Sequence, residues 1–182
     1  AQNKLYSSVT QSKFFRKKSV EKIHEELTIF KEQWKGEYVF FWADTFLAWS
    51  QTELEEFAEM YSEFKFPFWC QSRPETVSDV VGGYEKLKKL KEVGLHHMSF
   101  GMEHGNEGFR DKVIGRKYSN EDAISALRNP VKLDIAITIN NIIGFPDETH
   151  DLAMDTVRIN REIDSFTCSC STFAPYQGTE LR

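Results

Sequence analysis

The sequence predicts an α/β fold in which helices alternate with the strands of a parallel sheet. Short apolar runs that resemble strands alternate with amphipathic helix patterns through the whole chain of 182 residues. The expected strands begin about 30–40 residues apart, which is the length of one strand–helix unit. Several of the apolar runs are continuous rather than alternating, as is typical of parallel strands with both faces covered.

Five segments have the spacing of amphipathic helices, and local signals mark several of their ends. Ser19 precedes the first segment and can cap it, and Ser119 takes the same position before the fourth. Thr52 and Glu55 fit a capping box at the start of the second segment. The third should end at Gly94, because glycine readily adopts the left-handed conformation that follows a helix.

The strand-like runs lie between these helices. They are expected at residues 38–42, 66–70, 97–101, 135–143 and 166–173. The fifth helix separates the last two runs and is expected at residues 151–163. No linker or low-complexity stretch interrupts the pattern, so residues 1–182 are expected to form a single domain. We expect the 15 Phe and 4 Trp residues mainly to fill its core.

Composition disfavours several classes of protein. The chain has 23 basic and 28 acidic residues, a net charge of −5, whereas a nucleic-acid surface usually needs a basic stripe. No run reaches the ~20 apolar residues that span a bilayer, and residues 1–12 lack the apolar segment of a signal peptide. Three irregularly spaced cysteines make no disulfide framework. We therefore expect a cytoplasmic protein without nucleic-acid or membrane partners.

Two parallel architectures fit this pattern, a doubly wound open sheet and a β/α barrel. The Gly-x-Gly-x-x-Gly fingerprint of a dinucleotide-binding sheet is absent, which favours the barrel. Polar residues also gather directly after each expected strand, and in a parallel barrel these ends meet at one mouth, where active sites lie. They are Asp44 and Thr45, Gln71 to Arg73, Glu103 and His104, Asn140 and Asn141, and residues 175–179.

Five of these regions, in order, resemble the core of radical S-adenosylmethionine (radical SAM) enzymes. The resemblance covers about residues 14–182, and it is closest to the branch that often carries a cobalamin-binding domain upstream. It implies a partial, TIM-barrel-like β/α barrel with five strand–helix units. The matching motifs are residues 40–46, 70–73, 99–107 with 113–119, 141–149 and 173–181, which are similar to the second to sixth strands of the family.

One defining feature of that family is missing. The Cys-x3-Cys-x2-Cys loop that follows the family's first strand does not occur in this sequence. Cys70, Cys168 and Cys170 have the wrong spacing, so we expect them to be small buried side chains and no metal ligands. The resemblance then implies a fragment of a longer parent, lacking the first strand and the cluster loop, and inactive by itself.

The resemblance implies a radical SAM reaction in the full-length parent. A [4Fe–4S] cluster on the missing loop and S-adenosylmethionine would generate a 5′-deoxyadenosyl radical for hydrogen abstraction or group transfer on an unknown substrate. An electron donor would start the reaction, and cobalamin could take part. In such enzymes the cofactor supplies the difficult chemistry, while the protein orients it.

Ligand chemistry then assigns roles to residues at the mouth. An acceptor suits the amino group or ribose of S-adenosylmethionine, and a guanidinium fork suits its carboxylate, which selects Glu103 and Arg116. Asn141 is expected to contact the ribose or adenine. The backbone from Ile142 to Gly144 is expected beside the adenine, since Gly144 has no Cβ to block the approach.

Further residues follow from position in the motifs. Asp44 and Thr45 stand where many members carry a Gly-Gly-Glu run that contacts the amino group. Tyr176 is expected near the adenine edge, and Gln71 and Arg73 are expected to face the substrate.

Two other functions remain open at this stage. The first is an ordinary β/α-barrel enzyme that uses Glu103, with His104 or Asp44, in acid–base chemistry. The second is a non-catalytic barrel that serves as a binding or scaffolding domain.

Overall fold

The computed structural model describes residues 17–43 and 45–176. In this part five strands form one sheet in the order β1-β2-β3-β4-β5, and every neighbouring pair is parallel. The predicted α/β fold with a parallel sheet is therefore confirmed. The strands are β1 (Val39–Phe41), β2 (Phe68–Ser72), β3 (Leu95–Glu103), β4 (Ala136–Ile143) and β5 (Thr167–Thr172).

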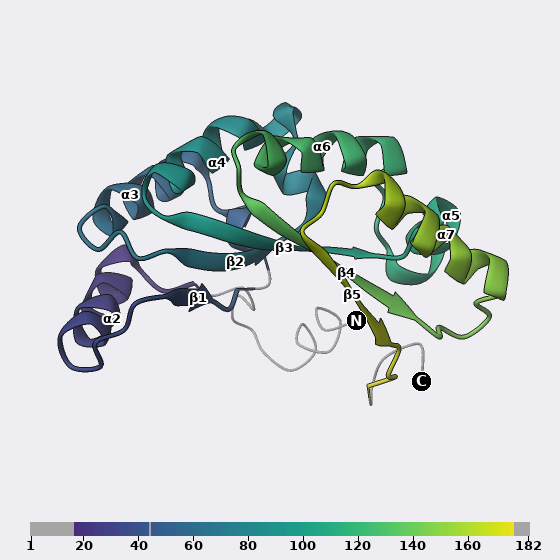
Figure 1. Cartoon of the computed structure of the whole chain (residues 1–182), viewed down its shortest axis with the longest axis horizontal. Coiled ribbons are helices and arrows are strands. Elements are labelled where there is room, and N and C mark those ends of the chain that lie inside the picture. The colour runs from purple at the N-terminus through teal and green to yellow at the C-terminus, as the bar shows by residue number, and fades with distance from the viewer. Residues whose placement is uncertain (1–16, 44, 177–182) are drawn as a thin grey trace, which may run out of the picture.

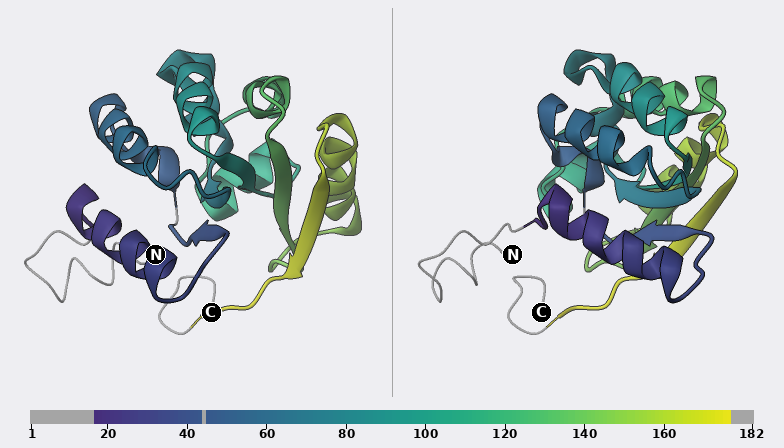
Figure 2. Two further views of the ribbon diagram at one scale, coloured as in Figure 1. Left: turned by 60° about the vertical axis from the view of Figure 1, so that its left-hand side comes forward. Right: turned by 90° about the vertical axis from the view of Figure 1, so that its left-hand side faces the viewer.

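Most helices of the described part lie along one side of the sheet, and the first lies beside β1 (Figure 1). Figure 2 shows them on the outside of a curved sheet, which gives the chain the form of a partial barrel. The longer helices are α2 (Val20–Glu32), α3 (Gln51–Tyr61), α4 (Gly83–Glu92), α6 (Asn120–Lys132) and α7 (His150–Glu162). The shorter ones are η1 (Phe46–Ala48), η2 (Pro74–Val77), η3 (Asp79–Val81), α5 (Glu107–Phe109) and η4 (Arg110–Ile114).

The predicted helix ends are largely confirmed. The hydroxyl of Ser19 accepts a hydrogen bond from the Lys22 amide at 3.3 Å at the start of α2. Ser119 caps α6, and α4 ends two residues before Gly94, which has φ 123°.

The capping box predicted at Thr52 and Glu55 was wrong. The structure forms the capping box two residues earlier, where the hydroxyl of Ser50 accepts from the Glu53 amide at 3.3 Å. Glu53 accepts in return from the Ser50 amide at 2.9 Å. Both pairs have the same spacing, so the outcome depends on which residue takes the extended backbone conformation, and Ser50 does.

The core lies between the sheet and the helices that cover it. Phe68 of β2 and Phe100 of β3 point toward the helices and are fully buried, as are Phe57 of α3 and Leu87 of α4. Phe57, Phe68 and Phe41 also contact one another edge to face. Several Phe residues thus fill the core as predicted, whereas Trp34, Trp42 and Phe166 are exposed.

The inner face of the sheet is different, because none of the described helices covers it. Trp42, just after β1, is 80% exposed, and all six residues of β5 are exposed. Strands covered on both faces were therefore a wrong expectation for the described residues. Cys70 is buried as expected, but Cys168 and Cys170 are exposed because they lie on this last strand.

The helices of the described residues are also too short and too polar to cross a bilayer.

Candidate functional site

The candidate site begins at Glu103, the last residue of β3. Glu103 has a left-handed backbone with φ 69°, which is uncommon for a residue other than glycine. The pairing of β3 with β4 shifts by one residue between Gly101 and Glu103. Irregular strand ends and strained backbone cluster at functional sites, where they redirect a side chain.

Glu103 and Arg116 come together although different segments carry them. The Nη2 atom of Arg116, from the segment before α6, donates to Oε1 of Glu103 at 3.0 Å. The two side chains are only 21% and 17% exposed. The other terminal nitrogen of Arg116, Nη1, is buried and has no hydrogen-bond partner. The arrangement leaves one arm of a guanidinium fork ready for a ligand carboxylate or phosphate.

A second arginine adds positive potential at this mouth. Burial raises the pKa of Glu103, and the positive charges of Arg116 and Arg73 oppose that rise. Arg73 forms an ion pair with Glu75, yet its Nε atom and Oε2 of Glu75 are buried without partners. The mouth therefore holds two guanidinium groups and two carboxylates. Two hydrogen-bond donors, on Arg116 and Arg73, and one acceptor, on Glu75, have no partner.

Sequence reasoning missed two residues that shape this mouth. A Cβ atom on Gly101 would lie 2.3 Å from Oε1 of Glu103, so the carboxylate occupies space that only glycine leaves free. The hydroxyl of Tyr118 lies 3.3 Å from the carbonyl oxygen of Met102, and burial raises the pKa of this phenol to about 12. Both residues lie inside the motifs already singled out, but no local pattern assigns them a role.

Asn141 is placed differently from its expected position. Its side chain is 4% exposed and bonds Asn160 of α7 at 3.2 Å and the carbonyl oxygen of Ser169 at 3.1 Å. The amide thus lies between sheet and helix, and only the backbone of Asn141 is left for a ligand. Its neighbour Asn140 points to the inner face, where it accepts from the Ser169 hydroxyl at 2.8 Å.

Gly144 closes the end of β4 in a left-handed conformation with φ 81°. Its amide and that of Phe145 both donate to Oε2 of Glu148, the second at 3.0 Å. Ile142, two residues earlier, is half-buried. The loop after β4 therefore has a fixed shape, and it presents backbone rather than side chains.

The remaining predicted residues are spread around the same edge. Gln71 is half-buried on β2, next to β3 in the sheet. Thr45 precedes η1 and is half-buried, whereas Tyr176 is 78% exposed near the end of the described chain. Asp44 and residues 177–181 lie outside the described residues.

His104 is not available for acid–base work with Glu103. It is fully buried, and its Nδ1 accepts from the Asn106 amide at 3.0 Å. Its Nε2 lies 2.9 Å from Oε1 of Glu148. Both ring nitrogens are thus engaged inside the protein, which disfavours an ordinary acid–base site built on His104.

Comparison with known proteins identifies the family of this chain. The sequence model of the Radical SAM superfamily matches residues 5–159. The chain belongs to the radical SAM superfamily.

Individual relatives agree with this assignment. The radical SAM chain is 28% identical over 176 residues to an uncharacterized methyltransferase of Pyrococcus horikoshii, covering 96% of this chain and 37% of that protein. The chain thus spans well under half of that relative.

Solved structures share the fold. TsrM, a radical S-adenosylmethionine methyltransferase from Kitasatospora setae solved with cobalamin and a [4Fe–4S] cluster, has a TM-score of 0.66 at 14% identity, over 86% of this chain and 29% of that chain. Coproporphyrinogen III oxidase (HemN) from Escherichia coli has a TM-score of 0.65, also at 14% identity, over 76% of this chain and 32% of that chain.

The described residues of this radical SAM chain contain no group of three or more His, Cys, Asp or Glu side chains that could hold a metal ion. Cys70 is buried in the core, and the two other cysteines lie on β5. The residues present therefore do not fit an iron–sulfur cluster.

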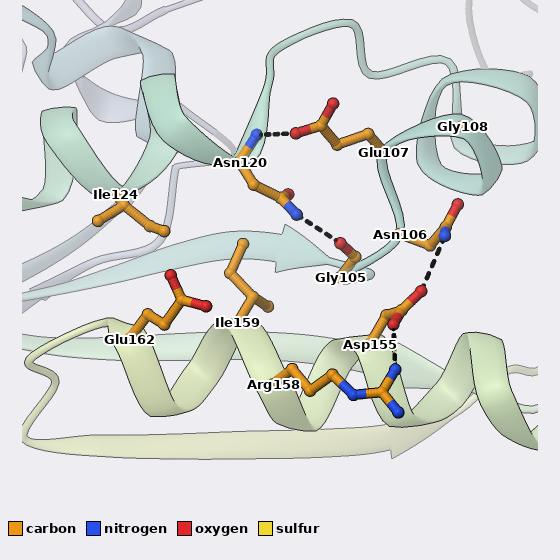
Figure 3. A pocket seen from close by; sticks show the side chains of 10 residues that line it. All are labelled: Gly105, Asn106, Glu107, Gly108, Asn120, Ile124, Asp155, Arg158, Ile159 and Glu162. Atoms are coloured by element: carbon orange, nitrogen blue, oxygen red, sulfur yellow. Dashed lines mark hydrogen bonds and ion pairs between the residues drawn. The ribbon is translucent and has the colours of Figure 1, made fainter.

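A surface cavity of about 430 Å³ lies among α5, α6 and α7 (Figure 3). Several of its polar side chains bond one another, since Asp155 accepts from Asn106 at 2.8 Å and also pairs with Arg158. Asn120 donates to the carbonyl oxygen of Gly105 at 2.8 Å. None of the predicted site residues lines this cavity, so we place the candidate site at the Glu103 mouth.

Proposed function

We propose that this chain is the S-adenosylmethionine-binding core of a radical SAM enzyme. The observation that carries the proposal is the buried, unpartnered Nη1 atom of Arg116 beside the Glu103 carboxylate. A buried donor without a partner costs free energy, and an acceptor atom of a ligand at this position would remove that cost.

The groups at the mouth fit the ends of this ligand. S-adenosylmethionine carries an ammonium, a carboxylate and a cationic sulfonium. Arg116 can direct its free arm to the carboxylate, as the geometry of a guanidinium favours. Glu103 can accept from the ammonium or from a ribose hydroxyl, and a cation there would favour its ionised form.

Two parts of the chain complete the proposed site. The backbone from Ile142 to Gly144, with that of Asn141, lies beside the adenine, where the fixed loop after β4 can follow a flat base. Asp44 and Thr45 are proposed as contacts of the amino group, and Tyr176 as a contact of the adenine edge. Gln71 and Arg73 face the substrate, next to the cation and carboxylate of the mouth.

The remaining cofactors would come from elsewhere in the parent. When bound, a [4Fe–4S] cluster and an electron donor supply the one-electron cleavage of the sulfonium that yields a 5′-deoxyadenosyl radical. The cluster ligands are proposed to lie on a Cys-x3-Cys-x2-Cys loop outside this chain, and residues 1–182 to form one domain of the parent.

The named relatives point to group transfer as one use of this chemistry. The Pyrococcus protein is described as a methyltransferase, and TsrM is a methyltransferase that binds cobalamin. We propose that cobalamin can take part here too, on an unidentified substrate, in a cytoplasmic parent without nucleic-acid or membrane partners.

The test uses the full-length parent, reconstituted anaerobically with iron and sulfide and then reduced with dithionite. S-adenosylmethionine should bind, and 5′-deoxyadenosine should appear in the products by mass spectrometry. Omission of the reductant is the control, because binding should persist while cleavage stops. A parent that holds the cluster but neither binds nor cleaves S-adenosylmethionine would refute the proposed function.

A further inference from the structure

A buried pair of side chains joins the loop after β3 to the loop after β4. His104 follows Glu103 directly, and its Nε2 lies 2.9 Å from Oε1 of Glu148, 44 residues later in the sequence. The two side chains are 0% and 3% exposed. A contact so far from solvent, between such distant residues, fixes one loop against the other.

The hydrogen bonds around His104 determine where its proton sits. Nδ1 lies 3.0 Å from the backbone amide of Asn106, and an amide can only donate. Nδ1 is therefore the acceptor, and the ring proton is on Nε2. His104 donates that proton to Glu148, so each partner has one defined role and the pair has one orientation.

Glu148 engages both of its oxygens. Oε1 accepts from His104, while Oε2 accepts from the amides of Gly144 and Phe145. A single carboxylate thus holds the turn of the β4 loop and ties it to the end of β3. In a desolvated setting such charge-assisted bonds are strong, and losing one leaves buried groups unpaired.

Aromatic rings seal the pair from water. The His104 ring lies against Phe109, with centroids 4.5 Å apart, and Phe145 meets both of these rings at an edge. Phe145 in turn stacks on Phe173, beyond β5. Neither His104 nor Glu148 can touch a ligand through this cover.

We propose that His104 and Glu148 form a clasp that sets the distance between the two halves of the ligand site. One half is Glu103 with Arg116, and the other is the backbone at Gly144. His104 and Glu148 are positioning residues, because they act on the site only through the loops they join. The effect on S-adenosylmethionine rests on the proposed function, whereas the coupling of the loops does not.

The first test measures hydrogen exchange of single amides by NMR in the 182-residue chain. In the wild type, the amides of Asn106, Gly144 and Phe145 should share one opening equilibrium. Glu148→Gln should speed exchange at Asn106, across the clasp, by about tenfold, the equivalent of one buried hydrogen bond. Asp151→Asn is the matched control, because Asp151 lies three residues away and is 95% exposed.

Exchange that rises at Gly144 and Phe145 but not at Asn106 would overturn the clasp. If Glu148→Gln does not fold, the exchange rates of the three amides in the wild type still test the clasp. Three amides that open independently of one another would refute the coupling of the loops. His104→Phe keeps a ring against Phe109 but removes the hydrogen-bond donor to Glu148. This variant should speed hydrogen exchange at the Gly144 amide, just as Glu148→Gln should speed it at the Asn106 amide.

The second test measures affinity for S-adenosylmethionine in the cluster-loaded parent by calorimetry. Glu148→Gln should weaken binding by about tenfold, while Asp151→Asn should leave it unchanged. Equal affinity for wild type and Glu148→Gln would refute the positioning role. If the wild type binds no S-adenosylmethionine, the proposed function fails, and exchange alone decides whether the clasp couples the loops.

Discussion

Replacement of Arg116 by alanine tests the proposed site most directly. The Arg116 side chain is 21% exposed, donates to Glu103 at 3.0 Å and keeps a buried Nη1 without a partner. Losing one charge-assisted contact in such a site costs about 1.5–3 kcal/mol. Affinity for S-adenosylmethionine should then fall by roughly 10- to 150-fold, at about 1.4 kcal/mol per decade.

The ion pair with Glu103 favours the upper part of that range. Arg116 opposes the rise that burial imposes on the pKa of Glu103. Without Arg116 the carboxyl would hold its proton to higher pH, so its attraction for the ligand ammonium would weaken as well. Arg116→Lys retains the charge but not the planar fork, and its affinity should lie between those of wild type and alanine variant.

The assay is calorimetry on the cluster-loaded parent, with iron and sulfide analysis of every variant. Arg128→Ala removes the same charge from an exposed position of α6 and serves as the control. Unchanged affinity of Arg116→Ala with the cluster present would remove Arg116 from the site. Loss of cluster and solubility together would show a structural role instead.

Three further predictions concern neighbouring residues and the cysteines. Gly101→Ala should weaken S-adenosylmethionine binding yet barely change the melting temperature, because its Cβ would displace the flexible end of Glu103; parallel losses would contradict this. Burial raises the pKa of Glu103, so the folded state holds that proton more tightly than the unfolded state. In urea unfolding, wild-type stability should therefore fall relative to Glu103→Gln as the pH rises above the ordinary pKa of 4.5; a constant difference would refute it. The 182-residue chain should hold no stable cluster after anaerobic treatment with iron and sulfide; stoichiometric iron that is lost on replacing Cys168 and Cys170 would contradict that.

Much of the fold could be predicted because its signals are local. The caps at Ser19 and Ser119 and the stop near Gly94 depend only on residues within one turn. Exposure is not local in this way. Cysteine is a residue type that is usually buried, as we expected for Cys168 and Cys170. Both are exposed because they lie on β5, the last strand of the sheet.

The meeting of Glu103 and Arg116 was predicted, since chemistry and motif position both select them. The orientation of Asn141 was not predicted. Which of the adjacent residues Asn140 and Asn141 faces the inner side of the sheet depends on the strand register. Residues on one strand alternate between faces, so Ile139 on the helix side places Asn141 there and Asn140 on the inner face.

The end of β3 combines this alternation of faces with an irregular pairing to β4. Gly101 pairs with Asn140, but the shift makes Glu103 the partner of Asn141, whose side chain points toward α7. Phe100 and Met102 are fully buried in the core, so the alternation of faces already places Gly101 and Glu103 on the inner face. The left-handed φ of 69° folds the Glu103 carboxylate back over Gly101, where only a missing Cβ leaves room. A sequence pattern of period two therefore predicts the face of Glu103, but not the left-handed backbone that holds its carboxylate over Gly101 and beside Arg116.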